Sequence, residues 1–281
     1  MAIRNGTTAG VKVLTTRAPA AGIAARNRQT AIGVALAILI IAAWLAAHVA
    51  AIFVIDWRVT SWWLAVPLVA VQTWLFTGLF IIAHDCMHGS LAPGRPWLNR
   101  AYGRLALFLY AAFSYDRLLP DHHRHHRRPG TADDPDFDPD HPDAFLPWFL
   151  RFMRHYYGWR EFLTMGAAMT VYVVALGPSI PAVLVFYALP AILSAFQLFY
   201  FGTWRPHRVE EGKGFADEHN SRTDHFPWLV SLFTCFHFGY HHEHHVSPTT
   251  PWWRLPGVRR AMAGAREDGA RDGKGLPGMA A

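Results

Sequence analysis

Histidine is the most unusual feature of this 281-residue chain, because its 17 histidines nearly equal the 20 Asp and Glu residues. Three groups of them have a spacing that places side chains on one face of a helix. The groups are His84 with His88, then His122 with His125 and His126, then His241 with His244 and His245. His237 lies one helical turn before His241, and His207 stands alone.

This spacing predicts metal binding. Buried imidazoles without partners lose hydration, and they repel one another once protonated. A metal ion removes both problems, because neutral imidazole is a good ligand for zinc, copper, iron and nickel. Eight to ten histidines exceed one coordination shell, so two metal ions are the economical interpretation. For single histidines such as His48, His141, His155, His219 and His225, a polar surface or helix-end role is the better interpretation.

Three acidic residues adjoin these groups and are candidates to orient the imidazoles from behind. They are Asp85, Asp121 and Glu243. A solvated charge is the alternative for each of them, and for Asp121, directly after Pro120, it is equally good. The sequence has no cysteine ligand set, since Cys86 would face away from the His84 and His88 pair in a helix and Cys235 is isolated. Both are expected to be reduced thiols.

Composition indicates a membrane protein. Hydrophobic residues make up 52% of the chain and charged residues 16%, against about 25% charged in soluble domains. The net charge of +6 therefore favours a membrane surface over nucleic acid as partner. Long uncharged runs predict four transmembrane helices in two hairpins, at residues 31–55, 62–83, 162–176 and 182–204. The break between the last two is Gly177–Pro181.

The expected fold is therefore an all-α integral membrane protein with a histidine-rich cap. Residues 1–30 form a basic tail, residues 31–262 the membrane domain, and residues 263–281 a disordered tail. Residues 101–115 and 148–157 are expected to be re-entrant or interfacial helices, and residues 131–147 a solvated loop. The distribution of Lys and Arg places both termini and the metal site in the cytoplasm.

The strings around the histidines are more specific than the histidines alone. The chain reads HDCMHGS at 84–90, with PGRP at 93–96. It reads YFGTWRPH at 200–207 and CFHFGYHHEHH at 235–245, with PWWRLP at 251–256. The three histidine groups resemble those of the membrane fatty acid desaturase/hydroxylase superfamily, and the flanking strings resemble those of the bacterial β-carotene 4-ketolases.

This resemblance implies a di-iron oxygenase that uses O2 to convert the C4 methylene of carotenoid β-ionone rings to a ketone. β-Carotene would give echinenone and then canthaxanthin, and 3-hydroxylated rings would lead toward astaxanthin. By matched position it implies these metal ligands: His84, His88, His122, His125, His126, His207, His241, His244 and His245, with His237 as a tenth candidate. The adjacent pairs His122–His123 and His241–His242 leave a one-residue ambiguity.

The resemblance also implies partners and a location. The substrate would enter from the lipid of a bacterial inner membrane. Because the chain has no dinucleotide-binding, haem or iron–sulfur motif, a separate electron donor is expected, ferredoxin with its reductase. No residue is assigned to substrate binding or to catalysis beyond the metal centre. Several aromatic residues could line a polyene tunnel or simply pack in the membrane: Trp62, Trp63, Phe80, Tyr110, Phe113 and Phe196.

Two alternatives stay open. The histidine groups also fit a carotenoid 3-hydroxylase, or a sterol or acyl hydroxylase or desaturase, of the same superfamily. A metal transporter is a more remote alternative, because transporters need ionisable residues at mid-membrane depth and the predicted spans have almost none.

Overall fold

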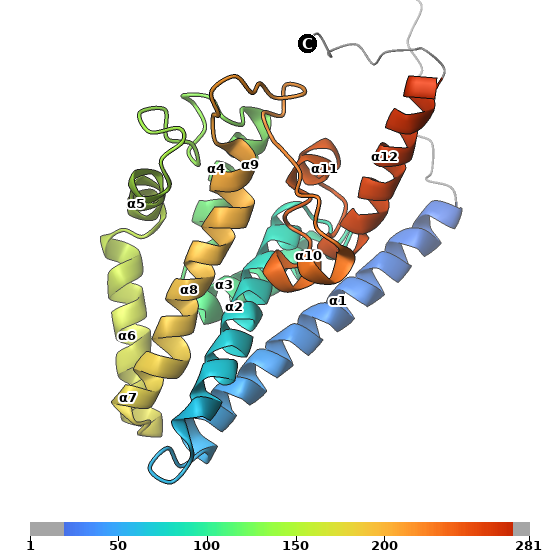
Figure 1. Cartoon of the computed structure of the whole chain (residues 1–281). Coiled ribbons are helices and arrows are strands. Elements are labelled where there is room, and N and C mark those ends of the chain that lie inside the picture. Colours follow the sequence, from blue (N-terminus) through green and yellow to red (C-terminus); the bar gives the residue numbers. More distant parts are fainter. Residues whose placement is uncertain (1–19, 272–281) are drawn as a thin grey trace, which may run out of the picture.

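The computed structural model describes residues 20–271, and within them the fold is all-helical (Figure 1). The longer helical segments are α1 (Ala20–Val49) with η1 (Ala50–Val54), α2 (Ala65–Met87), α3 (Pro96–Ala111), α6 (Trp159–Leu176) and α12 (Leu255–Arg271). One continuous segment is built from α7 (Ile180–Val183), η3 (Leu184–Ala188), α8 (Leu189–Phe199), η4 (Tyr200–Trp204) and α9 (Arg205–His207). The shorter elements are η2 (Trp62–Leu64), α4 (Tyr115–Arg127), α5 (Phe145–Tyr156), α10 (Trp228–Cys235), α11 (His241–Val246) and η5 (Trp252–Arg254).

Three helices of the described chain are long and apolar enough to span a bilayer. They cover Gly22–Val54, Trp62–Met87 and Ile180–His207. Their outer faces expose large aliphatic side chains such as Leu39 (64% exposed), as expected for surfaces that face lipid. Together with their length, this indicates a membrane protein.

The fourth expected span, 162–176, is not among them. It belongs to α6, which has only 18 residues, about 27 Å of helix. Its first turn carries Arg160 and Glu161, which shortens the apolar part further. Four spans in two hairpins are therefore not confirmed.

The core of the fold lies between α2 and its neighbours α1, α3 and α8. Phe76, Leu79 and Ile82 of α2 are almost completely buried, as are Ala106 and Leu107 of α3. The helix α3 covers the segment expected to be re-entrant or interfacial, and it packs lengthwise against α2. The last two turns of α2, which carry His84 and His88, therefore stand in a rigid, close-packed setting.

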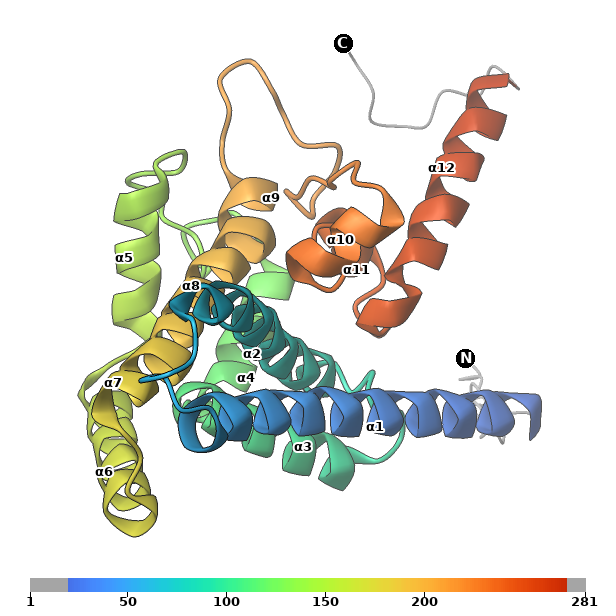
Figure 2. The same ribbon diagram turned by 60° about the horizontal axis from the view of Figure 1, so that its bottom comes forward.

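Short helices gather at one end of the long ones. Figure 1 shows α4, α9, α10 and α11 in the upper half of the molecule, where the helix α2 ends, and the turns between α1 and α2 and between α6 and α7 at the opposite end. Figure 2 shows α9, α10 and α11 from another side, well away from α6. Each histidine group of the sequence is on one of the elements at this upper end.

Both ends of the expected membrane domain need correction. The helix α1 begins at Ala20, so residues 20–30 of the expected tail are helical. The helix α12 runs to Arg271, so residues 263–271, expected to be disordered, are helical as well. In α12, apolar residues such as Leu255 and Val258 alternate with charged ones, and Leu255 is buried. The remaining parts of the two tails, 1–19 and 272–281, lie outside the described residues.

One glycine sets how closely α4 approaches α3. A Cβ atom on Gly103 would overlap the buried ring of Tyr115, the first residue of α4. Gly103→Ala should therefore lower the stability of the protein by about 1–3 kcal/mol through overpacking. The measurement is the thermal unfolding midpoint of the detergent-solubilised protein.

The matched control for this change is Gly166→Ala in α6. A Cβ there meets no atom within 4 Å, and the loss of backbone freedom in the unfolded chain should stabilise by about 0.5–1 kcal/mol. Equal midpoints for the two variants would show that the contact between Gly103 and Tyr115 is not tight.

Candidate metal centre

Nine histidines converge in two clusters. We call the first cluster A; its members are His84, His88, His122, His126 and His244. We call the second cluster B; its members are His125, His207, His241 and His245. Within each cluster the possible ligand atoms all lie within 4.8 Å of one another. The members of cluster B are all buried, and cluster A is partly buried.

Helical spacing distributes the histidines between the clusters. On α4, His122 and His126 are one turn apart and point into cluster A, whereas His125 points into cluster B. On α11, His244 belongs to cluster A and His241 to cluster B. These two helices therefore lie between the clusters and contribute to both. The ends of α2 and of the segment 180–207 supply the remaining ligands, one element to each cluster.

The contacts in cluster B fit a cation better than a hydrogen-bond network. The Nε2 atom of His241 lies 2.9 Å from Nε2 of His207 and 3.0 Å from Nε2 of His245. The latter atom lies 3.2 Å from Nε2 of His125. A ring nitrogen has either one proton or one lone pair, so it cannot serve two such neighbours at once. One positive ion at the point where the four lone pairs meet would satisfy all of them.

Cluster A shows the same feature. Nε2 of His122 lies 2.7 Å from Nε2 of His88, and Nε2 of His244 lies 3.0 Å from Nε2 of His126. Nε2 of His84 is buried beside them without a hydrogen-bond partner. A buried nitrogen without a partner costs free energy unless an unseen ligand uses it. Both clusters are therefore compatible with a metal site.

Burial keeps these imidazoles neutral. It lowers the pKa of His122 and of His244 well below the usual value, and neighbouring histidines lower it further. The same causes lower the pKa of His241 and of His245. Neutral imidazole is the form that binds metals, so the site needs no proton removal at neutral pH. His125 differs, because burial would lower its pKa but the carboxylate of Asp134 raises it above the usual value.

Two groups behind cluster B orient its rings. Nδ1 of His125 lies 2.9 Å from the Asp134 carboxylate, and Nδ1–H of His207 donates to the backbone carbonyl of Asn220 at 2.7 Å. A proton held on Nδ1 leaves Nε2 free to face the cluster. Sequence reasoning missed Asp134, because it lies in the acidic segment expected to be a solvated loop. In the structure Asp134 is only 2% exposed.

The three acidic residues chosen from the sequence have other principal contacts. Asp121 lies against His155 at 2.9 Å and against Arg124, and neither belongs to a cluster. Glu243 accepts hydrogen bonds from Thr223 and Arg259. Asp85 accepts one from the backbone N–H of Trp252, and its carboxylate lies 3.9 Å from Nδ1 of His84.

The structure brings together the nine main candidate ligands and leaves out the tenth. His237 is buried, but its Nδ1 lies 3.1 Å from the hydroxyl of Ser231, and its ring packs on Trp228. It has a positive φ of 64° just after the end of α10, which turns its side chain away from the His241 face. The continuous helix needed to place His237 above His241 does not form.

The structure also separates the two adjacent pairs. His122 is in cluster A, whereas Nε2 of His123 bonds the carbonyl of Met87 at 2.9 Å. His241 is in cluster B, whereas Nδ1 of His242 faces the Ser221 hydroxyl at 3.3 Å.

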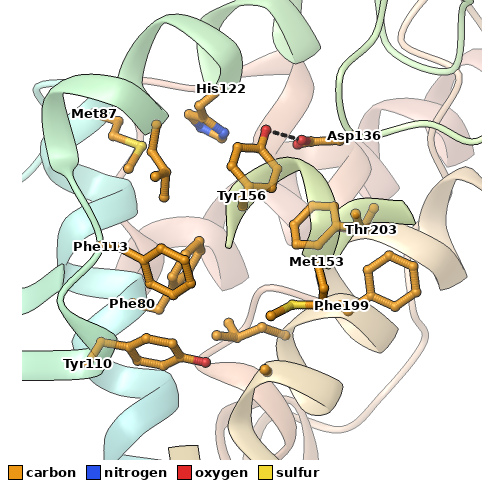
Figure 3. Close-up of a pocket in the computed structure, with 14 residues that line it drawn as sticks. Phe80, Met87, Tyr110, Phe113, His122, Asp136, Met153, Tyr156, Phe199 and Thr203 are labelled. Atoms are coloured by element: carbon orange, nitrogen blue, oxygen red, sulfur yellow. Dashed lines mark hydrogen bonds between the residues drawn. The ribbon is translucent and has the colours of Figure 1, made fainter. Parts of the chain in front are cut away.

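An apolar cavity of about 90 Å³ ends at His122 of cluster A (Figure 3). Its walls include Phe80, Tyr110 and Phe113, three of the aromatic residues named from the sequence. The others lie elsewhere: Phe196 stacks on Phe149, and Trp62 and Trp63 stack on each other at the start of the second span. The cavity therefore connects the histidine cluster to apolar surroundings.

The apolar spans and the two histidine clusters define a helical membrane protein whose side chains are compatible with a metal site. A family model described as fatty acid desaturase matches residues 60–167 and 158–272. A β-carotene ketolase of Paracoccus sp. (strain N81106 / MBIC 01143) is 51% identical over 226 residues, 78% of this chain and 89% of that protein. The chain therefore belongs to the fatty acid desaturase family, in the group that contains the β-carotene ketolases.

Two further relatives extend this comparison. A β-carotene ketolase of Paracoccus sp. (strain PC1) is 46% identical over 83% of this chain and 94% of its own length. A zeaxanthin 4-ketolase of Chlamydomonas reinhardtii is 38% identical over 83% of this chain and 54% of its own length.

Paired histidine variants test the ligand sets. His241→Ala should remove one of the four ligands of cluster B. It should lower the metal bound per chain by about half, because the three remaining histidines would hold an ion too weakly to keep it through dialysis. His242→Ala, its neighbour with equal burial, should keep the full metal content. Elemental analysis of the purified proteins, after extended dialysis, measures both. Equal metal loss in the two variants would overturn the assignment of His241 over His242.

Proposed function

We propose that this protein is a β-carotene 4-ketolase that converts the C4 methylene of β-ionone rings to a ketone. The observation that carries the proposal is the apolar cavity that ends at a ligand candidate of cluster A, His122. A long hydrocarbon can reach a metal centre by this route. The similarity to the Paracoccus β-carotene ketolases supports the same substrate class.

The reaction consists of two oxygenations of the same carbon. Each uses one O2, two electrons and two protons, inserts one oxygen atom into a C–H bond, and releases one water. The second product is a geminal diol, which loses water to leave the ketone. Over the whole sequence, one CH2 group, two O2 molecules, four electrons and four protons give one C=O group and three water molecules.

Two iron ions are the cofactors we propose, one in each cluster. Nine histidines would hold them: His84, His88, His122, His126 and His244 in cluster A, and His125, His207, His241 and His245 in cluster B. When bound, iron would supply the activation of O2 that attack on the allylic C–H bonds of C4 requires. The protein fixes the rings by hydrogen bonds on the far nitrogens of His125 and His207.

A second cavity of about 580 Å³ adjoins the first and shares Tyr110, Phe113, Met153 and Ala195 with it. Ile192, which is 56% exposed, lies on its outer wall. A polyene could therefore enter from the apolar surface of the spans and extend through both cavities, with one ring at His122. The same apolar walls keep water from the reacting carbon.

The membrane arrangement that we propose retains four spans. The helix α6 runs from α5 toward the far turn beside the segment 180–207 (Figure 1), and Val171 and Val174 on its outer face are 67% and 81% exposed. Both termini and the histidine clusters would then lie on the cytoplasmic side of a bacterial inner membrane, as the distribution of Lys and Arg favours. A cytoplasmic ferredoxin with its reductase would supply the electrons.

The zeaxanthin 4-ketolase relative supports a wider range of rings. Zeaxanthin carries a hydroxyl group at C3 of each ring, so a protein related to it is expected to oxidise C4 of such rings as well. On that basis the protein would lead from β-carotene to echinenone and canthaxanthin, and from 3-hydroxylated carotenoids toward astaxanthin.

Expression in a bacterial host that accumulates β-carotene tests the function. Ketolase activity should give products in which each modified ring is heavier by one oxygen and lighter by two hydrogens, detected by liquid chromatography with mass spectrometry. An inactive chain with His122→Ala is the matched control. Products that carry only hydroxyl groups would indicate a hydroxylase instead, and unchanged carotenoid with modified acyl chains would indicate a lipid desaturase.

A tryptophan at Ala195 tests the route to the site. This residue lines both cavities, so the larger ring of Ala195→Trp should block the passage and lower ketone formation at least tenfold while the metal content is retained. The control is Leu193→Trp, two residues away on a face that is 41% exposed, which should change activity little. Equal activity in the two variants would exclude this route for the substrate.

A further inference from the structure

The cavity beside cluster A is apolar except at one end. His122, Tyr156, Asp136 and Thr203 are its polar lining residues apart from Tyr110, whose hydroxyl lies 3.5 Å from the backbone carbonyl of Ala191. Figure 3 shows Tyr156, Asp136 and His122 together at one side of the cavity, opposite Phe80 and Tyr110. The proposed oxygenation of a hydrocarbon does not by itself require a carboxylate and a phenol at that place.

The carboxylate and the phenol hold each other in position. The hydroxyl of Tyr156 donates a hydrogen bond to Oδ1 of Asp136. The backbone of Asp136 is fixed on both sides, because its N–H donates to Asp134 at 2.9 Å and its carbonyl accepts from the indole N–H of Trp148 at 2.7 Å. The pair therefore comes from a loop and a helix that are tied together, and it is attached through Asp134 to His125 of cluster B.

The oxygen atoms of this pair that remain free can accept further hydrogen bonds but cannot donate them. The only proton of the Tyr156 hydroxyl is used on Asp136, so the phenol oxygen can accept but not donate. The second carboxylate oxygen of Asp136 has no closer described partner than Nδ1 of His125 at 3.9 Å, so it can accept as well. A ligand group that donates a hydrogen bond fits here, whereas a hydrocarbon or a carbonyl group gains nothing from the pair.

We propose that Tyr156 and Asp136 form a subsite for an alcohol, which binds the C4 hydroxyl of the half-oxidised ring and keeps that carbon at the metal centre for its second oxygenation. This inference rests on the proposed function and adds a step to it. The ring enters as a hydrocarbon, gains a hydroxyl group after the first oxygenation, and then donates a hydrogen bond to the pair. After the second oxygenation and loss of water, the ketone has no proton to donate and is released.

The subsite explains how a single site can carry out two oxygenations and stop. An alcohol that leaves a site in an apolar protein would diffuse into the membrane, where it is diluted among lipids. A hydrogen bond that forms only with the alcohol slows that loss at the one stage where the reaction is incomplete. Tyr156 and Asp136 act here as positioning residues, since they touch the hydroxyl group and not the oxidant.

The variant Tyr156→Phe tests the proposal. It keeps the ring that lines the cavity and removes the hydroxyl group. In a β-carotene-accumulating host it should raise the ratio of 4-hydroxylated to 4-ketone rings by about fivefold, the effect of one lost hydrogen bond. With purified enzyme, KM for a 4-hydroxylated carotenoid should rise by a similar factor, while KM for β-carotene should stay within about twofold.

The matched control is Met153→Leu, on the apolar wall of the same cavity. It changes the shape of the cavity without changing its hydrogen bonds, so it should alter the total turnover but not the ratio of alcohol to ketone. An unchanged ratio in Tyr156→Phe, or an equal change in both variants, would overturn the alcohol subsite. A wild-type enzyme that forms no ketone would instead contradict the proposed function. Failure of the subsite and failure of the proposed function therefore give different results.

A measurement on the unmodified protein covers the case in which Tyr156→Phe does not fold. The 4-hydroxylated carotenoid should protect the detergent-solubilised protein against heat at a lower concentration than echinenone or canthaxanthin does, because only the alcohol donates to the pair. Equal protection by the alcohol and the ketones would overturn the proposal.

Discussion

The convergence of nine imidazole side chains in two clusters is the constraint on which the rest of this structure depends. Neutral rings that turn lone pairs toward one point repel one another, and protonated rings would repel more. A cation at each meeting point changes the sign of that interaction, so binding of metal and packing of the helix ends are linked. Every element that reaches the clusters is therefore placed by two requirements at once, its own apolar contacts and the position of its histidines.

The link between metal binding and helix packing explains why the helices have different roles. The helix α2 packs against α8, the central part of the long apolar segment 180–207, and the two provide a fixed frame. The short, polar helices α4 and α11 could not hold their place by burial of apolar residues alone, since most of α11 is histidine. They lie between the clusters and supply rings to both, so metal would tie them to the frame. Short segments with few apolar contacts are otherwise the first to open in a folded protein.

Much of this arrangement could be predicted from the chain itself. The helical spacing within HxxxH and HxxHH predicted which histidine rings share a helix face. The long uncharged runs of the sequence predicted three of the membrane spans. The predictions that failed concern residues whose positions depend on the backbone between the helices. The positive φ of His237 breaks the helix that its spacing suggested, and burial of Asp134 depends on a contact with His125 that no local pattern encodes. The acidic composition of that loop indicated exposure to solvent, whereas the hydrogen bond between Asp134 and a histidine on the preceding helix fixes its buried position.

The histidines of the clusters and the polar pair Tyr156 and Asp136 also differ in how far the sequence reveals them. The histidines are visible in the sequence because a helix repeats them, whereas Asp136 and Tyr156 come from a loop and a separate helix and meet only in the folded chain. Their position follows from Asp134, which holds His125 with its carboxylate and the N–H of Asp136 with the same group. One buried carboxylate thus sets both the orientation of a ring in cluster B and the polar end of the cavity beside cluster A. A change that moves Asp134 should therefore disturb the ring of His125 and the position of Asp136 together, because its carboxylate contacts both.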